Sequence, residues 1–357
     1  MSQLLMIDIG AGTMDILCYD TLSGEHFKAV ALSPVRHVAE QINRTKGALA
    51  VSGVEMGGGP VTEALRRRAE TDPVAISASA AATLHHDMDR VSSWGFTIEE
   101  NRAIAQLSSD PNYTAVRLGD LQPDRIAQVV AGLGLPMAFD AVALCAQDHG
   151  LAPKGVSHLD FRHNLFQGIL DQKATPFDLL YRRDEIPESF NRLRSMADDA
   201  GMLNAREIYV MDSGMAAMCG ASRDTAANGS PVVILDIATS HTVAAAMEGD
   251  LVAGFVEYHT RDITLDRLES LLVALADGNI RHEQILEEGG HGAYLKHAVG
   301  FDNVQAIIAT GPKRRLMAES KLPIVWGAPW GDNMMTGTVG LLEAVRRKKN
   351  LAPIQYL

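Results

Sequence analysis

Short continuous runs of apolar residues recur along the chain, and turn residues bound most of them. In the first half these runs lie at residues 4–7, 16–19, 27–32, 48–52 and 141–145, with a helix-like stretch at 61–70. In the second half they lie at residues 207–211, 232–235, 242–247, 251–256 and 306–309, with helix-like stretches at 215–219, 265–276 and 334–348. Apolar runs of this length bounded by turn residues predict buried strands. Strands mixed with helices along one chain predict an α/β fold.

Residues 225–231, Thr-Ala-Ala-Asn-Gly-Ser-Pro, form the best turn or linker between two parts of the chain. We therefore expect one domain at residues 1–224 and a second at residues 230–357. Both parts begin alike, with an apolar strand, an aspartate, a small-residue turn that carries threonine, and a second apolar strand. Residues 8–13 match residues 236–242 in this way. This weak internal duplication predicts two related units.

The balance of charge narrows the choice of ligands. The chain carries 32 basic and 44 acidic residues, which gives a formal net charge of −12. Broad electrostatic binding of nucleic acid needs a basic face, so we expect no nucleic-acid partner. An anionic ligand such as ATP would need a local positive feature, which can be a Mg²⁺ ion, a group of backbone N–H donors or a helix N-terminus.

Cysteine usage and the lack of targeting segments indicate the compartment. The three cysteines, Cys18, Cys145 and Cys219, have neither metal-ligand nor redox-pair spacing, and their scarcity suits a reducing environment. The first ten residues lack the basic region of a signal peptide, and no apolar stretch is long enough to span a membrane. We therefore expect a cytoplasmic protein with no membrane partner.

The first candidate site combines Asp8 with Gly10, Gly12 and Thr13. Glycines let backbone N–H groups point into one space, where they can bind phosphate oxygens, and a threonine hydroxyl adds a donor. A carboxylate at the end of a strand can hold Mg²⁺. A hairpin with a plain glycine turn is the alternative. A dinucleotide fingerprint is excluded because Asp15 stands where the third glycine would be, and GxxxxGK[ST] does not occur.

Taken together, these motifs resemble those of the actin, heat-shock ATPase and sugar-kinase (ASKHA) superfamily. The pattern Asp8-x-Gly-x-Gly-Thr13-x-Asp15 resembles its first phosphate loop. Residues 236–242 resemble its second, although Ala-Thr-Ser-His replaces the glycines there. Residues 307–313 are similar to its adenosine loop and residues 212–220 to its connecting helix. The motifs follow one another in the order of that superfamily.

The resemblance implies two RNase H-like domains that bind ATP and Mg²⁺ in the cleft between them, with the last helix packing back on the first domain. Asp8, counted among the catalytic residues, and Asp236 would then hold the metal ion. The residues that would bind the nucleotide are Gly10, Ala11, Gly12, Thr13, Asp236, Thr239, Thr242, Thr310 and Gly311.

Two further motifs would face the phosphate acceptor. Asp212 matches the aspartate that serves as general base in sugar kinases, and it can equally cap the helix that follows it; the two roles are compatible. Gln147 and His149 stand in a Gln-Asp-His-Gly sequence that is similar to the Gln-x-His-Gly turn of some sugar kinases. That similarity would place them near the substrate, and a polar turn at the end of a strand is the alternative.

The whole chain also resembles the DUF1786 family, whose members are labelled as similar to pyruvate formate-lyase activating protein. Radical activases need three closely spaced cysteines for an iron–sulfur cluster, and this chain lacks that cluster of cysteines. We therefore expect no radical chemistry. The histidine groups at residues 85–86 and 158–163 match no zinc pattern, so a solvated loop or a helix cap competes there with metal binding.

These expectations favour an ATP-dependent enzyme that uses Mg-ATP in an inter-domain cleft, in the first place a kinase of an unidentified small molecule. An ATP-driven activator or reactivase of a protein client is one alternative. A nucleotide-binding scaffold without catalysis is another, and the glycine-poor second loop supports it. Resemblance at the level of the fold does not decide among them.

Overall fold

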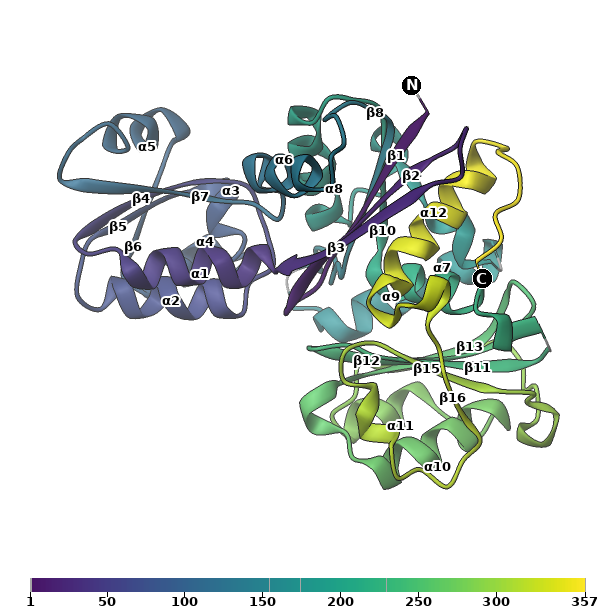
Figure 1. The fold of residues 1–357 in the computed structure, drawn as a ribbon. Helices are drawn as coiled ribbons and strands as arrows, with labels where there is room; N and C mark the ends of the chain where they lie inside the picture. The colour runs from purple at the N-terminus through teal and green to yellow at the C-terminus, as the bar shows by residue number, and fades with distance from the viewer. Residues whose placement is uncertain (1, 154, 174, 229, 357) are drawn as a thin grey trace.

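The computed structural model describes residues 2–153, 155–173, 175–228 and 230–356, without the side chains of residues 158 and 173, and this part of the chain forms three sheets (Figure 1). Two sheets have six strands each, in the orders β3-β2-β1-β8-β10-β9 and β14-β13-β12-β11-β15-β16. The third has four strands in the order β6-β5-β4-β7.

The first sheet joins an antiparallel meander to two parallel strands. Its strands are β1 (Gln3–Ile9), β2 (Thr13–Asp20), β3 (His26–Leu32), β8 (Phe139–Ala146), β9 (Tyr181–Arg182) and β10 (Ala205–Asp212). β1, β2 and β3 pair antiparallel, whereas β8 pairs parallel with both β1 and β10. Because parallel strands end at the same edge, Asp8 pairs with Cys145 and Asp212 lies beside Ala146 at that edge.

The second sheet repeats this arrangement. Its strands are β11 (Val232–Ile237), β12 (His241–Glu248), β13 (Leu251–His259), β14 (Gly292–Leu295), β15 (Ile307–Thr310) and β16 (Ile324–Trp326). β11 to β14 pair antiparallel in sequence, and β15 and β16 continue the sheet in parallel from β11. Two such RNase H-like sheets form the actin-like ATPase fold, which confirms the predicted α/β class.

The third sheet belongs to a segment inserted between β3 and β8. Its strands are β4 (Ala48–Gly53), β5 (Val74–Ser77), β6 (Phe96–Glu99) and β7 (Tyr113–Leu118), all parallel. Its helices are α1 (Pro34–Arg44), α2 (Pro60–Ala69), α3 (Ala78–Ala81), α4 (Met88–Ser93) and α5 (Asn101–Leu107). This unit has its own hydrophobic core and projects to the left of the rest of the molecule in Figure 1.

Two helices cross between the six-stranded sheets. The remaining helices are α6 (Pro123–Gly132), α7 (His158–Lys173), α8 (Asn191–Asp199), α9 (Ser213–Ala221), α10 (Leu265–Ala276), α11 (His282–Glu287) and α12 (Thr336–Lys348). Of these, α9 and α12 lie side by side, and α12 also packs against β1 and β8. A Cβ atom on Gly220 would lie 1.8 Å from the Thr336 carbonyl oxygen, so glycine is required for this close approach.

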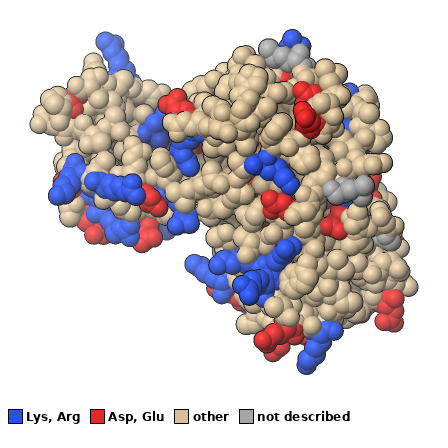
Figure 2. All heavy atoms as spheres, viewed as in Figure 1, with Lys and Arg blue, Asp and Glu red and all other residues tan. Residues whose placement is uncertain are grey.

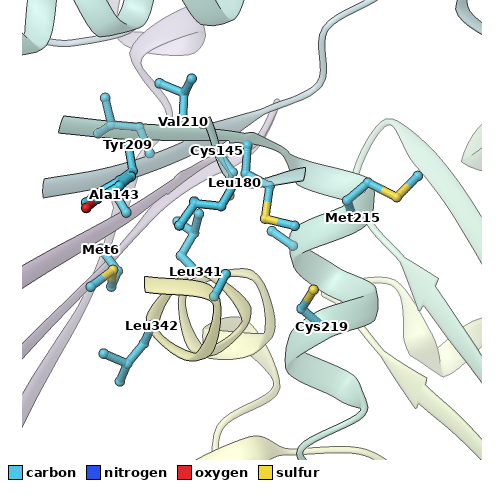
Figure 3. Close-up of a cluster of buried hydrophobic side chains, with 14 of the residues drawn as sticks. Met6, Ala143, Cys145, Leu180, Tyr209, Val210, Met215, Cys219, Leu341 and Leu342 are labelled. Atoms are coloured by element: carbon cyan, nitrogen blue, oxygen red, sulfur yellow. The ribbon is translucent and has the colours of Figure 1, made fainter. Parts of the chain in front are cut away.

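Burial on both faces explains the continuous apolar runs. In β11, Val233 and Leu235 face the core beneath α10, while Val232 and Ile234 face the larger core that contains α9 and α12. Strands covered on both faces lose the usual alternation of polar and apolar residues. Figure 3 shows the larger core where Leu341 of α12 lies among side chains of the first sheet.

The surface is mixed in charge. On the face shown in Figure 2, acidic and basic side chains are interspersed over both the inserted unit and the main body. Among the helices of the described residues, none is both long enough and apolar enough to cross a membrane.

Candidate functional site

A cavity of about 590 Å³ is lined by residues from both six-stranded sheets and from the inserted unit. The turns of the two equivalent hairpins, β1–β2 and β11–β12, line it, as do the end of β8 and the starts of α9 and α12. The inserted unit contributes residues 55–60 and 82–86. The cavity is therefore built at the carboxyl ends of the central strands, where open α/β sheets bind their ligands.

The two hairpin turns approach each other closely. In the first, Gly10 N–H donates to the Thr13 carbonyl oxygen over 3.0 Å, and in the second, Ala238 N–H donates to the His241 carbonyl oxygen over the same 3.0 Å. A Cβ atom on Gly12 would lie 2.7 Å from Thr239 Oγ1. Gly12 thus lets the turns meet across the cavity, with backbone N–H groups and threonine hydroxyls as the available donors.

Carboxylates from both sheets gather next to these turns. Asp8 lies directly opposite Asp15 in the antiparallel β1–β2 pair, and Asp236 is the last residue but one of β11 in the other sheet. Burial, followed by repulsion from Asp236 and Asp212 against a hydrogen bond with Cys145, raises the pKa of Asp8 to about 7. Burial and the neighbouring Asp8 raise the pKa of Asp15 to about 8. Burial raises the pKa of Asp236 to about 6.

These carboxylates have the oxygen chemistry that a hard divalent cation prefers, although the described residues do not bring all three within metal-ligand distance of one another. Asp15 Oδ1 is buried and has no hydrogen-bond partner among the described residues. Mg²⁺ prefers oxygen ligands and is usually held by one or two carboxylates together with water and phosphate oxygens. A cation beside Asp8, Asp15 and Asp236 would offset the cost of burying these carboxylates, which is the largest cause of their raised pKa values, and also the repulsion between Asp8 and Asp15. The donor set therefore suits Mg²⁺.

Most of the residues expected at the nucleotide line the cavity. They are Gly10, Ala11, Gly12, Thr13, Asp236, Thr239 and Gly311. Thr242 and Thr310 are not among the lining residues, because both are buried behind the wall. The Thr310 hydroxyl instead donates to Asp236 Oδ1 over 3.0 Å, and Thr242 Oγ1 lies 3.0 Å from Thr260 Oγ1.

Gly311 needs its glycine for a different reason. It has a φ of +86°, and a Cβ atom there would lie 2.5 Å from the Ile237 carbonyl oxygen. Its own carbonyl oxygen accepts a hydrogen bond from Asn333 Nδ2 over 3.2 Å. This contact ties the β15 end of the cavity to the segment that leads into α12.

Asp212 caps α9, as one of its two interpretations predicted. Its Oδ1 accepts from Gly214 N–H over 2.9 Å and its Oδ2 from Asp148 N–H over 3.2 Å. The same carboxylate pairs with Arg162 at 2.9 Å, and both side chains are buried. Asp212 is not among the residues that line the cavity, whereas Arg162 is. The carboxylate thus holds a cation at the cavity wall, and both of its oxygens have hydrogen-bond partners within the protein.

The part of the cavity wall around Arg162 is polar, and we call it the polar end of the cavity. Gln147 and His149 both line it, and the Gln147 amide donates to Glu257 Oε1. Glu257 also accepts from Arg162 Nε over 3.4 Å. Despite burial, which opposes ionisation, Arg162 and then His291 hold the pKa of Glu257 well below its usual range. Glu257 is therefore a carboxylate that is already paired.

Histidines surround this polar end. Burial, followed by the nearby Arg162, lowers the pKa of His149 to about 3. Burial also lowers the pKa of His241 to about 3, although Glu257 opposes the change. Both imidazoles are neutral at physiological pH, so they can accept a hydrogen bond or bind a metal ion.

Of the two histidine groups singled out in the sequence, His85 and His86 line the cavity on the side of the inserted unit, whereas His163 is not among its lining residues. His86 Nε2 is 3.0 Å from Glu55 Oε1, and His85 Nδ1 accepts from Asp87 N–H over 2.9 Å. The ring of His163 stacks on that of His282 at 3.6 Å, while the side chain of residue 158 lies outside the described part. Within the described residues neither group forms a metal-ligand cluster.

Sequence reasoning missed several residues of the cavity. Arg162, Arg192, Glu257 and Gly337 line it but were not expected there. A Cβ atom on Gly337 would lie 2.1 Å from Asp8 Oδ2. Gly337, the second residue of α12, was a usable signal, because a helix start that packs against a carboxylate leaves no room for a side chain. No signal in the sequence pointed to Arg162 and Glu257, since only the tertiary fold brings these two residues together.

Solved structures with a similar arrangement include three that cover most of this chain. An exopolyphosphatase-like protein shares 10% identity at a TM-score of 0.31, covering 86% of this chain and 66% of its own, so the chain spans just under two thirds of it. The ethanolamine utilization protein EutJ from Carboxydothermus hydrogenoformans shares 10% identity at a TM-score of 0.36, and the match covers 95% of this chain and 88% of EutJ. The activator of the 2-hydroxyisocaproyl-CoA dehydratase from Clostridium difficile, with bound ADPNP, shares 8% identity at a TM-score of 0.35, covering 99% of both chains.

Comparison with curated protein sequences gives no match. A family model, in contrast, matches residues 56–316, which include β8, β10, most of the second sheet and the cavity residues between them. The matched region is well over half of the chain. The chain therefore belongs to the family described as "Putative pyruvate format-lyase activating enzyme (DUF1786)".

Proposed function

We propose that this protein binds Mg-ATP in the cavity and transfers the terminal phosphoryl group to a small molecule. The observation that carries the proposal is the meeting of two equivalent hairpin turns beside Asp8, Asp15 and Asp236. Phosphoryl transfer needs positioning and charge neutralisation more than covalent help from the protein.

In this proposal one end of the cavity binds the nucleotide with Mg²⁺, and the other end binds the acceptor. Asp8 and Asp236, with Asp15 beside them, would hold a Mg²⁺ ion, which neutralises charge on the phosphates when it is bound. Backbone N–H groups of residues 11–13 and 239–240 would bind phosphate oxygens, because no lysine or arginine among the described residues lines this end, whereas the N–H groups of Gly10 and Ala238 already donate within their own turns. The adenosine would lie against Gly311 and Pro312.

The acceptor would occupy the polar end. Gln147, His149 and Arg162 present an amide, a neutral imidazole and a guanidinium to the same space. A small polar molecule with a hydroxyl group matches this set of donors and acceptors. Asp212 acts here as a positioning residue that holds Arg162, in place of the general-base role that its match to sugar kinases implied.

The description of the family names a pyruvate formate-lyase activating enzyme, and the cysteines of this chain argue against the iron–sulfur chemistry that such an activity would need. Cys18 lies on β2, Cys145 on β8 and Cys219 on α9, and all three are buried. Burial raises the pKa of all three thiols, so none is poised as the thiolate that binds iron. We therefore propose phosphoryl transfer in place of radical chemistry.

Calorimetric titration of the whole chain with Mg-ATP tests the proposal directly. We expect saturable binding to the wild type and at least tenfold weaker binding to Asp236→Asn, because a lost carboxylate weakens the cation site. Release of ADP in the presence of a panel of small hydroxylated acceptors then tests the transfer. Absence of Mg-ATP binding by the wild type would refute the proposal. Release of phosphate in the absence of an acceptor would instead indicate that the protein is an ATPase.

A further inference from the structure

A second cluster of chemically active side chains lies at the edge of the cavity, in the second sheet. His241 opens β12 and His259 closes β13, and the antiparallel register pairs these two residues directly. His291 stands immediately before β14, where its backbone N–H donates to the Glu257 carbonyl oxygen over 2.8 Å. Three neighbouring strands thus bring three histidines to one end of the sheet, although they are far apart in the chain.

The three side chains are close enough to share one ion. One ligand nitrogen from each of His241, His259 and His291 lies within 4.8 Å of the others. Their ring centroids are separated by 4.7 Å, 4.9 Å and 4.2 Å. Zinc binds histidine nitrogen at about 2.0–2.1 Å, so small side-chain rotations bring all three nitrogens around a single ion.

We propose that His241, His259 and His291 bind one divalent transition-metal ion, with Zn²⁺ as the ion that the geometry favours. Three histidines with one open position are the ligand set of catalytic zinc sites. Carboxylate oxygens, which would favour Mg²⁺ or Ca²⁺, are absent from this group of three. The site is distinct from the aspartate cluster and does not rest on ATP binding.

Buried polar atoms without hydrogen-bond partners are a second reason to infer that a ligand binds at this histidine cluster. Among the described side chains, the few buried nitrogen and oxygen atoms without a hydrogen-bond partner include His241 Nε2 and His291 Nδ1. Buried polar atoms in native proteins nearly always have partners, so two in one cluster call for an explanation. Core packing alone would leave these nitrogens unsatisfied, whereas a bound ion would use the lone pair of His241 Nε2 and would orient the His291 ring so that its Nδ1 can donate to Glu257.

Glu257 is placed to support such an ion from outside. Its Oε1 atom lies 3.6 Å from His291 Nδ1. Metal-bound histidines commonly donate their other ring N–H to a carboxylate, which orients the ring and fixes the tautomer. In that arrangement Glu257 would keep the proton on Nδ1 of His291 and leave Nε2 for the metal.

The open coordination position would face the polar end of the cavity. His241 lines the cavity together with Glu257 and His149. The ring of His149 lies 5.8 Å from that of His241 and 6.4 Å from that of His291. The ion would therefore bind a water molecule or a substrate oxygen, such as that of a carboxylate or a hydroxyl group, at the place where the acceptor is proposed to lie.

Metal analysis of untagged protein tests the site. The whole chain is incubated with Zn²⁺, dialysed and measured by mass spectrometry, alongside His259→Gln, His291→Gln and the control His297→Gln. His297 lies just after β14 of the same sheet, but it pairs with Glu248 outside the histidine cluster. We expect about one ion per chain in the wild type and the control. We expect at least tenfold weaker retention in the two cluster variants, because each loses a ligand.

A spectroscopic measurement covers the case in which the cluster variants fail to fold. Co²⁺ added to chelator-treated wild type should give the intense visible bands of a tetrahedral site, and one equivalent of Zn²⁺ should abolish them. No Zn²⁺ retention and no tetrahedral Co²⁺ spectrum in the wild type would overturn the proposal. Equal retention by folded wild type and cluster variants would also overturn it. Metal content is counted without ATP, so this result is independent of the outcome for Mg-ATP.

Discussion

Asp8 and Asp15 face each other as a direct cross-strand pair in the β1–β2 hairpin. Like charges in such positions destabilise a sheet. Both carboxyl groups have a raised pKa, about 7 for Asp8 and about 8 for Asp15, with burial as the largest cause. A hairpin that keeps two acidic groups opposed beside a cavity is organised for a cation, and its stability should depend on pH and on that cation.

The first prediction concerns the pH dependence of stability without divalent cations. A raised pKa means that the folded protein binds more protons than the unfolded chain between the ordinary value of 3.8 and about 8. The free energy of unfolding therefore falls as pH rises through this window. Asp8→Asn removes one of the two carboxyl groups that cause this fall in the free energy of unfolding. We expect it to raise the free energy of unfolding at pH 8 by roughly 2–4 kcal/mol, with little gain at pH 4, in urea titrations with chelator.

Mg²⁺ supplies the control for this prediction. The ion should stabilise the wild type at pH 8 and should stabilise Asp8→Asn much less, since the variant lacks a ligand. Asp302→Asn, at an exposed position, should behave as the wild type does. If Asp8→Asn lowered stability equally at both pH values, the carboxylate would have a structural role in place of the proposed one.

The second prediction concerns the contact between the two hairpin turns. In Gly12→Ala the new Cβ atom would meet Thr239 Oγ1 at 2.7 Å and push the turns apart. We expect the affinity for Mg-ATP to fall about tenfold, because phosphate binding relies on both turns, while the free energy of unfolding changes by less than about 1 kcal/mol. Calorimetric titration measures the first and urea unfolding the second.

A double variant separates this clash from other effects. Gly12→Ala combined with Thr239→Ala removes the hydroxyl that the new methyl group meets, so it should recover part of the affinity. Gly132→Ala, where a Cβ atom has no neighbour within 4 Å, should bind as the wild type does. Loss of affinity in the double variant as large as the sum of both single losses would contradict a direct contact.

Local patterns in the sequence predicted the parts of the fold that are local in the chain. The hairpin with Asp8 and the equivalent hairpin with Asp236 were recognised because strand, aspartate and small-residue turn follow one another within a few positions. Asp15 belonged to the quoted motif, but its pairing with Asp8 depends on the register. The inserted sheet was largely missed, because β5 and β6 have only four residues each and give no clear periodicity.

The candidate sites depend on contacts that no local pattern carries. Arg162 on α7 meets Asp212 and Glu257 across separations of 50 and 95 residues. His259 and His291 come together because β13 and β14 pair, which a single sequence does not reveal. The composition of the second phosphate loop can be read from the sequence, whereas the position of His241 beside His259 and His291 became visible only in the structure.

The third prediction concerns the buried ion pairs of Arg162. The guanidinium is buried and pairs with Asp212 at 2.9 Å and with Glu257 at 3.4 Å. Arg162→Met would leave both carboxylates buried without their cation, and removing one partner of a buried pair costs about 3–5 kcal/mol. We expect a loss of this size in urea unfolding. Arg162→Met combined with Asp212→Asn should lose less than the sum of the single changes, and strict additivity would contradict the pairing.

The fourth prediction concerns the helices that join the two six-stranded sheets. A Cβ atom on Gly340 of α12 would lie 1.9 Å from the Ala216 carbonyl oxygen of α9. Gly340→Ala therefore forces the helices apart, and overpacking of this kind costs about 1–3 kcal/mol. Gly168→Ala in α7, at an exposed position with no neighbour within 4 Å, should instead gain about 0.5–1 kcal/mol from its better helix propensity. Thermal and urea unfolding of the two variants should thus differ in sign, because only Gly340 sits where two backbones meet. A stabilising effect of both alanines would show that the α9–α12 contact is looser than its geometry indicates.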